Sequence, residues 1–102
     1  MKYYACFGML FIALTAQSEI IHLTKATFED LGTSVKFSGL VCSERGLCNP
    51  KTLVATKSKR MILETFNDER FSWNELPNHF KGKASFFYSK AGVLDRIYFI
   101  KD

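Results

Sequence analysis

Hydrophobic and polar positions in the second half of the chain alternate in short runs, which is the pattern of β-strands. The clearest runs are Ala84 to Tyr88 and Leu94 to Ile100, which are rich in aromatic and β-branched residues. Gly92 in their connector supplies the left-handed backbone conformation that hairpin turns use. Because alternation in the second run is imperfect, the sequence predicts an antiparallel hairpin with one bulge.

Three further strand-like runs precede this hairpin, and they are residues 35–41, 53–55 and 60–66. Gly39 interrupts the first run and predicts a break or bulge there. The polar residues 57–59 predict a hairpin turn that returns the chain from the second run into the third. Asn67 and Asp68 then form a turn signal.

Residues 71–80 predict a single helical turn at one end of the sheet. Ser72 and Glu75 have the spacing of a capping box. Pro77 disfavours helical geometry in the residue before it and predicts that the apolar stretch ends there. We expect Trp73, Leu76 and Phe80 to cover one end of the sheet.

The first eighteen residues, MKYYACFGMLFIALTAQS, have the layout of a secretory signal peptide. Lys2 precedes a nearly uncharged apolar run, and the small residues Ala16 and Ser18 follow it. This pattern predicts a signal peptide over residues 1–18 and a single small domain over residues 19–102. The expected localisation is exported, either periplasmic or extracellular.

A second interpretation of this region is a helix that continues from about residue 3 to residue 31. Apolar residues recur at helical spacing, Lys25 and Glu29 form an i,i+4 pair, and Gly32 suits the end of a helix. The apolar run is shorter than the about 20 residues of a membrane span, which favours the cleaved signal. Contact with a membrane is therefore expected only if this segment is retained. Residues 20–31 also alternate weakly as a strand, through Ile21 and Leu23, and we prefer the helix.

These patterns together predict an α+β, β-rich fold. We expect a small antiparallel sheet of four to five strands, with one N-terminal helix packed on the sheet or preceding it.

The cysteines predict one disulfide. Cys6 lies in the apolar leader, which leaves Cys42 and Cys48 as an even pair. In an oxidising compartment such a pair is expected to form a structural disulfide. A zinc site would need further ligands, and neither His22 nor His79 has finger spacing, so no metal is expected.

The net charge of +4 promotes solubility and a mild attraction to anionic surfaces. The basic residues gather in two stretches, at residues 51–60 and 81–83. Because an exported protein rarely meets nucleic acid, we interpret these stretches as solvated surface and expect no nucleic-acid partner.

The residues that could carry catalysis are few. His22 is interpreted as a structural histidine and His79 as an exposed loop residue. No nucleophile elbow, zinc-binding helix motif or phosphate-binding glycine loop is present in the sequence. We therefore expect no enzyme activity, no catalytic residues and no cofactor.

The aromatic residues are more numerous than one face of a small sheet usually buries. Residues 86–88 are three consecutive aromatics, so a strand points at least one of them outward. Exposed aromatics beside basic residues are typical of interfaces between proteins. The candidate interaction surface comprises Trp73, His79, Phe86, Tyr88, Arg96 and Tyr98.

The order of these parts resembles the globular region of minor pseudopilins from type II secretion and type IV pilus systems. The parts are a helix ending at Gly32, the segments VKFSGLVCSERGLC and RMILETF, and the closing hairpin KASFFYSKAGVLDRIYF. The resemblance implies a pilin-like structural subunit. The prepilin cleavage sequence is absent, because Met9 follows Gly8 and no acidic residue occurs before Glu19. Membrane anchoring is therefore not carried over.

The sequence predicts a small exported, non-enzymatic protein that acts through contacts with another protein. The alternatives are a pilin-like structural subunit and an inhibitor or immunity protein directed against a hydrolase.

Overall fold

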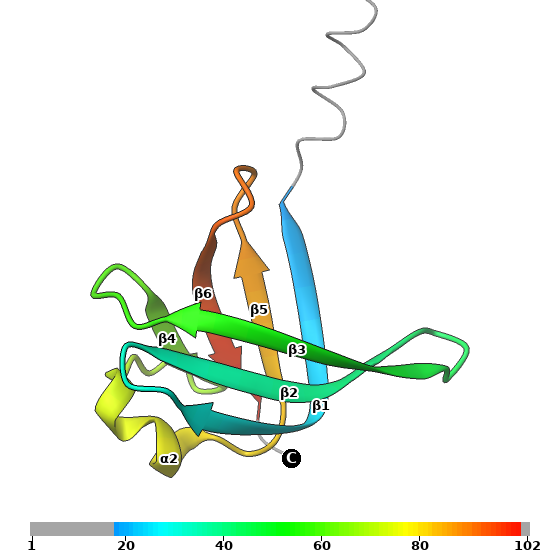
Figure 1. Ribbon diagram of the computed structural model, residues 1–102, viewed down its shortest axis with the longest axis horizontal. Helices are drawn as coiled ribbons and strands as arrows, with labels where there is room; N and C mark the ends of the chain where they lie inside the picture. Colours follow the sequence, from blue (N-terminus) through cyan, green and yellow to red (C-terminus); the bar gives the residue numbers. More distant parts are fainter. Residues whose placement is uncertain (1–17, 101–102) are drawn as a thin grey trace, which may run out of the picture.

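The computed structural model describes residues 18–100, which form a mixed six-stranded sheet and one short helical segment (Figure 1). The order of strands in the sheet is β3-β2-β1-β5-β6-β4. The elements are β1 (Glu19–Asp30), β2 (Ser34–Cys42), β3 (Cys48–Thr56), β4 (Ile62–Thr65), the 3₁₀ turn η1 (Trp73–Glu75), α2 (Leu76–His79), β5 (Ala84–Tyr88) and β6 (Leu94–Phe99).

The long strand β1 belongs to both halves of the sheet because it bends in its middle. Residues 19–23 pair with β5, whereas residues 24–30 pair with β2. The register shifts between Thr24 and Thr27, and Lys25 has a positive φ of 49°. The Ala26 N–H leaves the ladder and donates to the carbonyl of Gly82 at 2.7 Å. As a result β2 and β3 cross over the remaining strands (Figure 1).

The hydrophobic core lies between these two crossing layers. Its largest fully buried side chains come from both layers and from α2, and they are Phe37, Phe86, Phe99, Leu23, Leu76, Ile97 and Val35. Phe37 from β2 makes an edge-to-face contact with Phe86 from β5, with ring centroids 5.0 Å apart. Aromatic pairs of this geometry add about 0.5–1.5 kcal/mol to the burial of their surface.

Gly39 in β2 lies directly against the bend of β1. A β-carbon at this position would lie 2.9 Å from the carbonyl oxygen of Thr24 and 3.0 Å from the Cα of Ala26. Pairing of β2 with β3 continues through Gly39 without a shift. The predicted bulge at Gly39 is therefore wrong: the bulge lies in the neighbouring strand β1, and the glycine makes room for it.

Two local predictions are confirmed. The strands β5 and β6 form the antiparallel hairpin, its register shifts between Phe87 and Tyr88, and Gly92 has a φ of 80°. A helical turn forms after Ser72, whose N–H donates to a carboxylate oxygen of Glu75 at 3.4 Å. The end predicted before Pro77 is wrong, because Leu76 is helical and α2 continues through Pro77 to His79. Leu76 is buried in the core, and Trp73 and Phe80 pack against the core.

Three predictions of the fold need correction. Residues 19–30 form the strand β1, so the helix expected to end near Leu31 is wrong for this segment. The sheet has six strands rather than four or five, and it is not wholly antiparallel, because β4 runs parallel to β6. Residues 57–59 do not form a hairpin turn, since β4 lies at the opposite edge of the sheet from β3. The signal peptide predicted over residues 1–18 falls almost wholly outside the described residues.

Candidate functional site

The hairpin of β2 and β3 continues beyond the rest of the sheet as a two-stranded arm. The last pair between β1 and β2 is Thr24 with Leu40, whereas pairing between β2 and β3 continues to Cys42 with Cys48. We call residues 41–51 the β2–β3 arm. Every residue from 42 to 52 is exposed, and Figure 1 shows the arm extending away from the body of the sheet.

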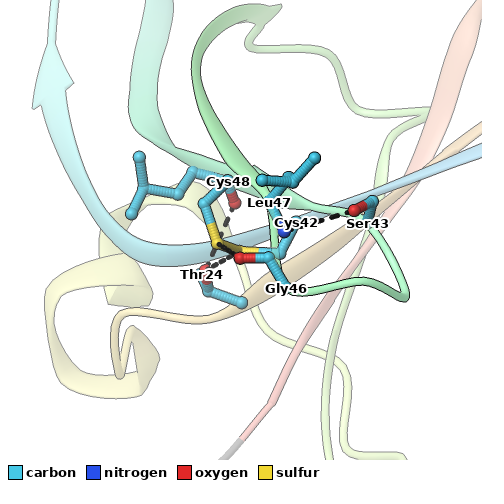
Figure 2. The surroundings of a disulfide bond; sticks show 7 residues. Thr24, Cys42, Ser43, Gly46, Leu47 and Cys48 are labelled. Atoms are coloured by element: carbon cyan, nitrogen blue, oxygen red, sulfur yellow. Dashed lines mark hydrogen bonds between the residues drawn. A yellow bond between two sulfur atoms is a disulfide. The ribbon is translucent and has the colours of Figure 1, made fainter.

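A disulfide between Cys42 and Cys48 closes the arm just before its tip, as the sequence predicts (Figure 2). The two cysteines are direct cross-strand partners with Cα atoms 4.0 Å apart. At the base of the arm, the Thr24 hydroxyl donates to the carbonyl of Leu40 at 3.3 Å and lies 3.8 Å from the Cys42 sulfur. The disulfide and this contact hold the arm at the point where β1 stops pairing with β2.

The five residues between the cysteines form an ordered tip. The Ser43 N–H donates to the carbonyl of Leu47 at 2.8 Å, and the Gly46 N–H donates to the carbonyl of Ser43 at 3.0 Å. The Leu47 N–H also reaches the Ser43 hydroxyl at 3.3 Å, and Gly46 has a φ of 83° that suits glycine. These bonds fix the backbone of the tip before any partner is present.

The tip presents an apolar side chain beside charged ones. The Leu47 side chain is 67% exposed, which is the highest value among the large hydrophobic residues of the described chain. Glu44 and Arg45 belong to the same five-residue tip and are exposed. A rigid convex tip of this kind is suited to entering a concave surface on another protein.

Sequence reasoning did not single out this arm. The signal for it was present, since the segment SERGLCNPKT, which follows Cys42 and contains Cys48, has an Arg-Gly turn signal and lacks the alternation of a half-buried strand. What the sequence could not show is that β1 stops pairing at Leu40, which leaves both strands of the arm without a third neighbour.

The predicted surface residue Phe86 lies in the core, so the expectation that it is exposed is wrong. Phe86 pairs with Ile21 on one side and Ile97 on the other, and these side chains face the core. Because side chains alternate along a strand, its neighbour Phe87 takes the outer face instead, between Ile20 and Arg96.

The other predicted surface residues lie in three separate places. Arg96 and Tyr98 share the outer face of β6, where Arg96 pairs with Glu64 at 3.1 Å and the Tyr98 hydroxyl donates to the carbonyl of Phe66 at 3.0 Å. Tyr88 packs against the core. Trp73 and His79 belong to the helical segment, so the six residues do not form one patch.

Trp73 and His79 are both half-buried and make structural contacts. The Trp73 indole N–H donates to the carbonyl of Ser58 at 3.4 Å. The His79 ring lies against Phe71, with centroids 4.5 Å apart. The expectation that His79 is an exposed loop residue is therefore wrong, because α2 ends at His79 and turns the ring towards Phe71.

His22 forms a short contact with a serine that the sequence did not indicate. Its Nδ1 lies 2.6 Å from the hydroxyl oxygen of Ser85, which is only 3% exposed. A serine nucleophile also needs donors for an oxyanion. Since β5 pairs with β1 on one edge and β6 on the other, the backbone N–H groups beside Ser85 are directed at these strands. The geometry is that of a cross-strand hydrogen bond.

Among residues 18–100, two titratable groups have shifted pKa values. Hydrogen bonds from Lys57 and from the Gly32 N–H lower the pKa of Asp30, whose carboxylate lies 2.8 Å from the Lys57 Nζ. Burial raises the pKa of Tyr88, and the negative charge of Glu19 adds to this effect. Neither group lies on the arm.

Comparison of the chain with models of protein families, with curated proteins and with solved structures finds no match. Within residues 18–100, no helix has the length and apolar character to cross a membrane. The same residues contain no group of three or more His, Cys, Asp or Glu side chains placed to hold a metal ion.

Proposed function

We propose that the protein is an exported, non-enzymatic binding protein that inserts the tip of its β2–β3 arm into a concave site on another protein. The observation that carries this proposal is the arm itself. It is exposed throughout residues 42–52, yet its tip is closed by a disulfide and by backbone hydrogen bonds.

Rigidity in the free protein favours binding through such a tip. Ordering a flexible residue costs about 1–2 kcal/mol of backbone entropy. A five-residue tip that is already ordered avoids most of this cost when it binds. Leu47 supplies the apolar anchor, and the Arg45 guanidinium supplies donors for carboxylate or carbonyl groups around it.

Export is supported by the leader-like sequence of residues 1–18 and, less directly, by the Cys42–Cys48 disulfide. Disulfides form and persist mainly in oxidising compartments. Within this proposal, a convex tip favours the role of an inhibitor or immunity protein that occupies the cleft of a hydrolase. The pilin-like alternative loses one of its supports, because residues 19–30 form a strand.

The experiment compares two exposed hairpin tips of the same protein. The arm variant carries Arg45→Ala and Leu47→Ala. The control carries Lys90→Ala and Val93→Ala in the β5–β6 turn, where Val93 is 60% exposed. Wild type and both variants are immobilised and exposed to the exported proteins of the source cells, and retained proteins are quantified by mass spectrometry.

We expect at least one protein to bind the wild type and the control and to be lost from the arm variant. Its purified form should bind the arm variant at least about tenfold more weakly, which is the loss of one anchor contact. The double variant Cys42→Ser with Cys48→Ser should weaken binding without abolishing it. Equal retention by the arm variant, or no protein retained by the wild type, would contradict the proposal.

A further inference from the structure

A groove lies between the chain that leaves β3 and the chain that follows β4, and we call it the β4 groove. Its volume is about 530 Å³, which falls within the range of about 300–1,000 Å³ that is usual for small-molecule sites. It lies on the side of the molecule that holds β4 and α2, away from the arm (Figure 1). The apolar side chains that line it are Met61, Leu63, Phe71 and Trp73.

The charged side chains that line the β4 groove are all positive. They are Lys57, Lys59 and Arg70. Four other grooves on the described surface each include the carboxylate of Glu19 or Asp95. The sign of its charge therefore distinguishes the β4 groove from these four.

Two of the three cations are available to a ligand. The Lys57 Nζ is already paired with the carboxylate of Asp30 at 2.8 Å. Lys59 and Arg70 are exposed, and within residues 18–100 neither of them forms an ion pair. An anion bound in the groove would therefore meet unpaired positive charge, and no carboxylate of the lining would repel it.

Hydrogen bonds hold both sides of the β4 groove. On one side, the Met61 N–H donates to the carbonyl of Ser58 at 3.2 Å. On the other side, the Phe71 N–H donates to the carbonyl of Leu63 at 3.0 Å. The Trp73 indole N–H joins the two sides, because it donates to the same carbonyl of Ser58 at 3.4 Å. The groove is thus formed before a ligand binds, which lowers the cost of ordering it on binding.

We propose that the β4 groove binds a small organic anion in which an apolar group, such as an aromatic ring, is joined to a carboxylate. The apolar group packs against Phe71 and Trp73, whose rings offer surface for burial and stacking. The carboxylate pairs with Lys59 and Arg70, and a guanidinium can hold a carboxylate through two parallel hydrogen bonds.

A small molecule suits the β4 groove better than an acidic segment of another protein. The free cations and the aromatic side chains line one groove whose volume matches a single small ligand. This inference goes beyond the proposed function, because the groove and the β2–β3 arm share no residue.

The test titrates the purified protein with phenylbutanoate and, as its neutral match, with phenylbutanol. Nuclear magnetic resonance of the indole N–H of Trp73, the single tryptophan, reports binding in the groove. The groove variant carries Lys59→Gln and Arg70→Gln. The control variant removes the same charge outside this groove, through Lys51→Gln and Lys90→Gln. Unchanged midpoints of urea unfolding confirm that both variants are folded.

We expect phenylbutanoate to shift the indole resonance in a saturable way. It should bind the wild type and the control variant at least about threefold more tightly than phenylbutanol, as expected for two exposed charge pairs. The groove variant should lose most of this preference, and added salt should reduce it in the wild type.

Three results would overturn the proposal: no saturable shift at millimolar phenylbutanoate, equal affinity for the anion and the alcohol, or an equal loss of the preference in both variants. A fourth result would do the same. An acidic peptide with one phenylalanine between two glutamates, if it bound more than about tenfold more tightly than phenylbutanoate, would assign the groove to a segment of another protein.

Discussion

Replacing Gly39 by alanine tests how the bend of β1 and the base of the arm are packed. The added β-carbon would lie 2.9 Å from the carbonyl oxygen of Thr24 and 3.0 Å from both the Cα and the Cβ of Ala26. Two of these atoms belong to the backbone, so a change of rotamer cannot relieve the contacts. The backbone is also restrained, because the Ala26 N–H donates to the carbonyl of Gly82 at 2.7 Å.

The expected loss of stability follows from two opposing effects. Overpacking in a well-packed region costs about 1–3 kcal/mol, and contacts with backbone atoms place Gly39→Ala near the upper end of this range. The same substitution reduces the entropy of the unfolded chain and returns about 0.4–1 kcal/mol. We therefore expect the free energy of unfolding to fall by about 2 kcal/mol.

Urea unfolding measures this change, and the fluorescence of Trp73, the single tryptophan, reports it. With a slope of about 1–2 kcal/mol per molar urea, the midpoint should fall by about 1–2 M. Ser38→Ala, at the neighbouring position of β2, is the control and should change stability by less than about 0.5 kcal/mol. A midpoint for Gly39→Ala at or above that of wild type would refute the packing argument, because it would mean that the bend relaxes without cost.

Three further predictions concern the disulfide and the two shifted groups. Replacing Cys42 and Cys48 by serine should lower the free energy of unfolding by at most about 2.5 kcal/mol and speed hydrogen exchange mainly in the arm; equal acceleration in β5 would contradict this. Because the pKa of Asp30 is lowered in the folded state, Asp30 adds to the free energy of unfolding above its unfolded pKa. This contribution is lost as pH falls through its folded pKa. Asp30→Asn should therefore flatten the acid side of a plot of urea midpoint against pH, and an unchanged slope would contradict the assignment. The raised pKa of Tyr88 means that stability falls as pH rises above the unfolded pKa of tyrosine. Tyr88→Phe should reduce this loss of stability at alkaline pH and remove one late-ionising tyrosine from an absorbance titration. A variant that still shows the same late-ionising tyrosine as the wild type would argue against this.

The first strand shows why the sequence was misleading about residues 19–30. The core-facing residues are Ile21 and Leu23 before the bend, and Ala26 and Phe28 after it. The bulge at Lys25 changes which side chains face the core, so the simple alternation of a strand is broken. The resulting mixed spacing imitates a helix, although pairing with β5 and β2 decides for a strand.

The position of β4 depended on contacts far apart in the sequence. Residues 57–59 have the composition of a turn, but composition does not tell whether the next strand pairs with the previous one. β4 instead crosses to the other edge of the sheet and pairs in parallel with β6, where Leu63 reaches the core. The candidate site also depends on contacts far apart in the sequence, since the arm exists only because β1 turns away from β2 beyond Leu40.

Features whose causes are local can be derived from the sequence alone. The β5–β6 hairpin with its bulge, the helical turn after Ser72 and the pairing of Cys42 with Cys48 each depend on a few neighbouring residues, and the structure contains all three. By contrast, only the fold reveals the bend of β1, the parallel edge strand and the projecting arm. These features depend on which strands pair across long separations in the sequence. That pairing is selected by burial in a shared core and not by local backbone preference.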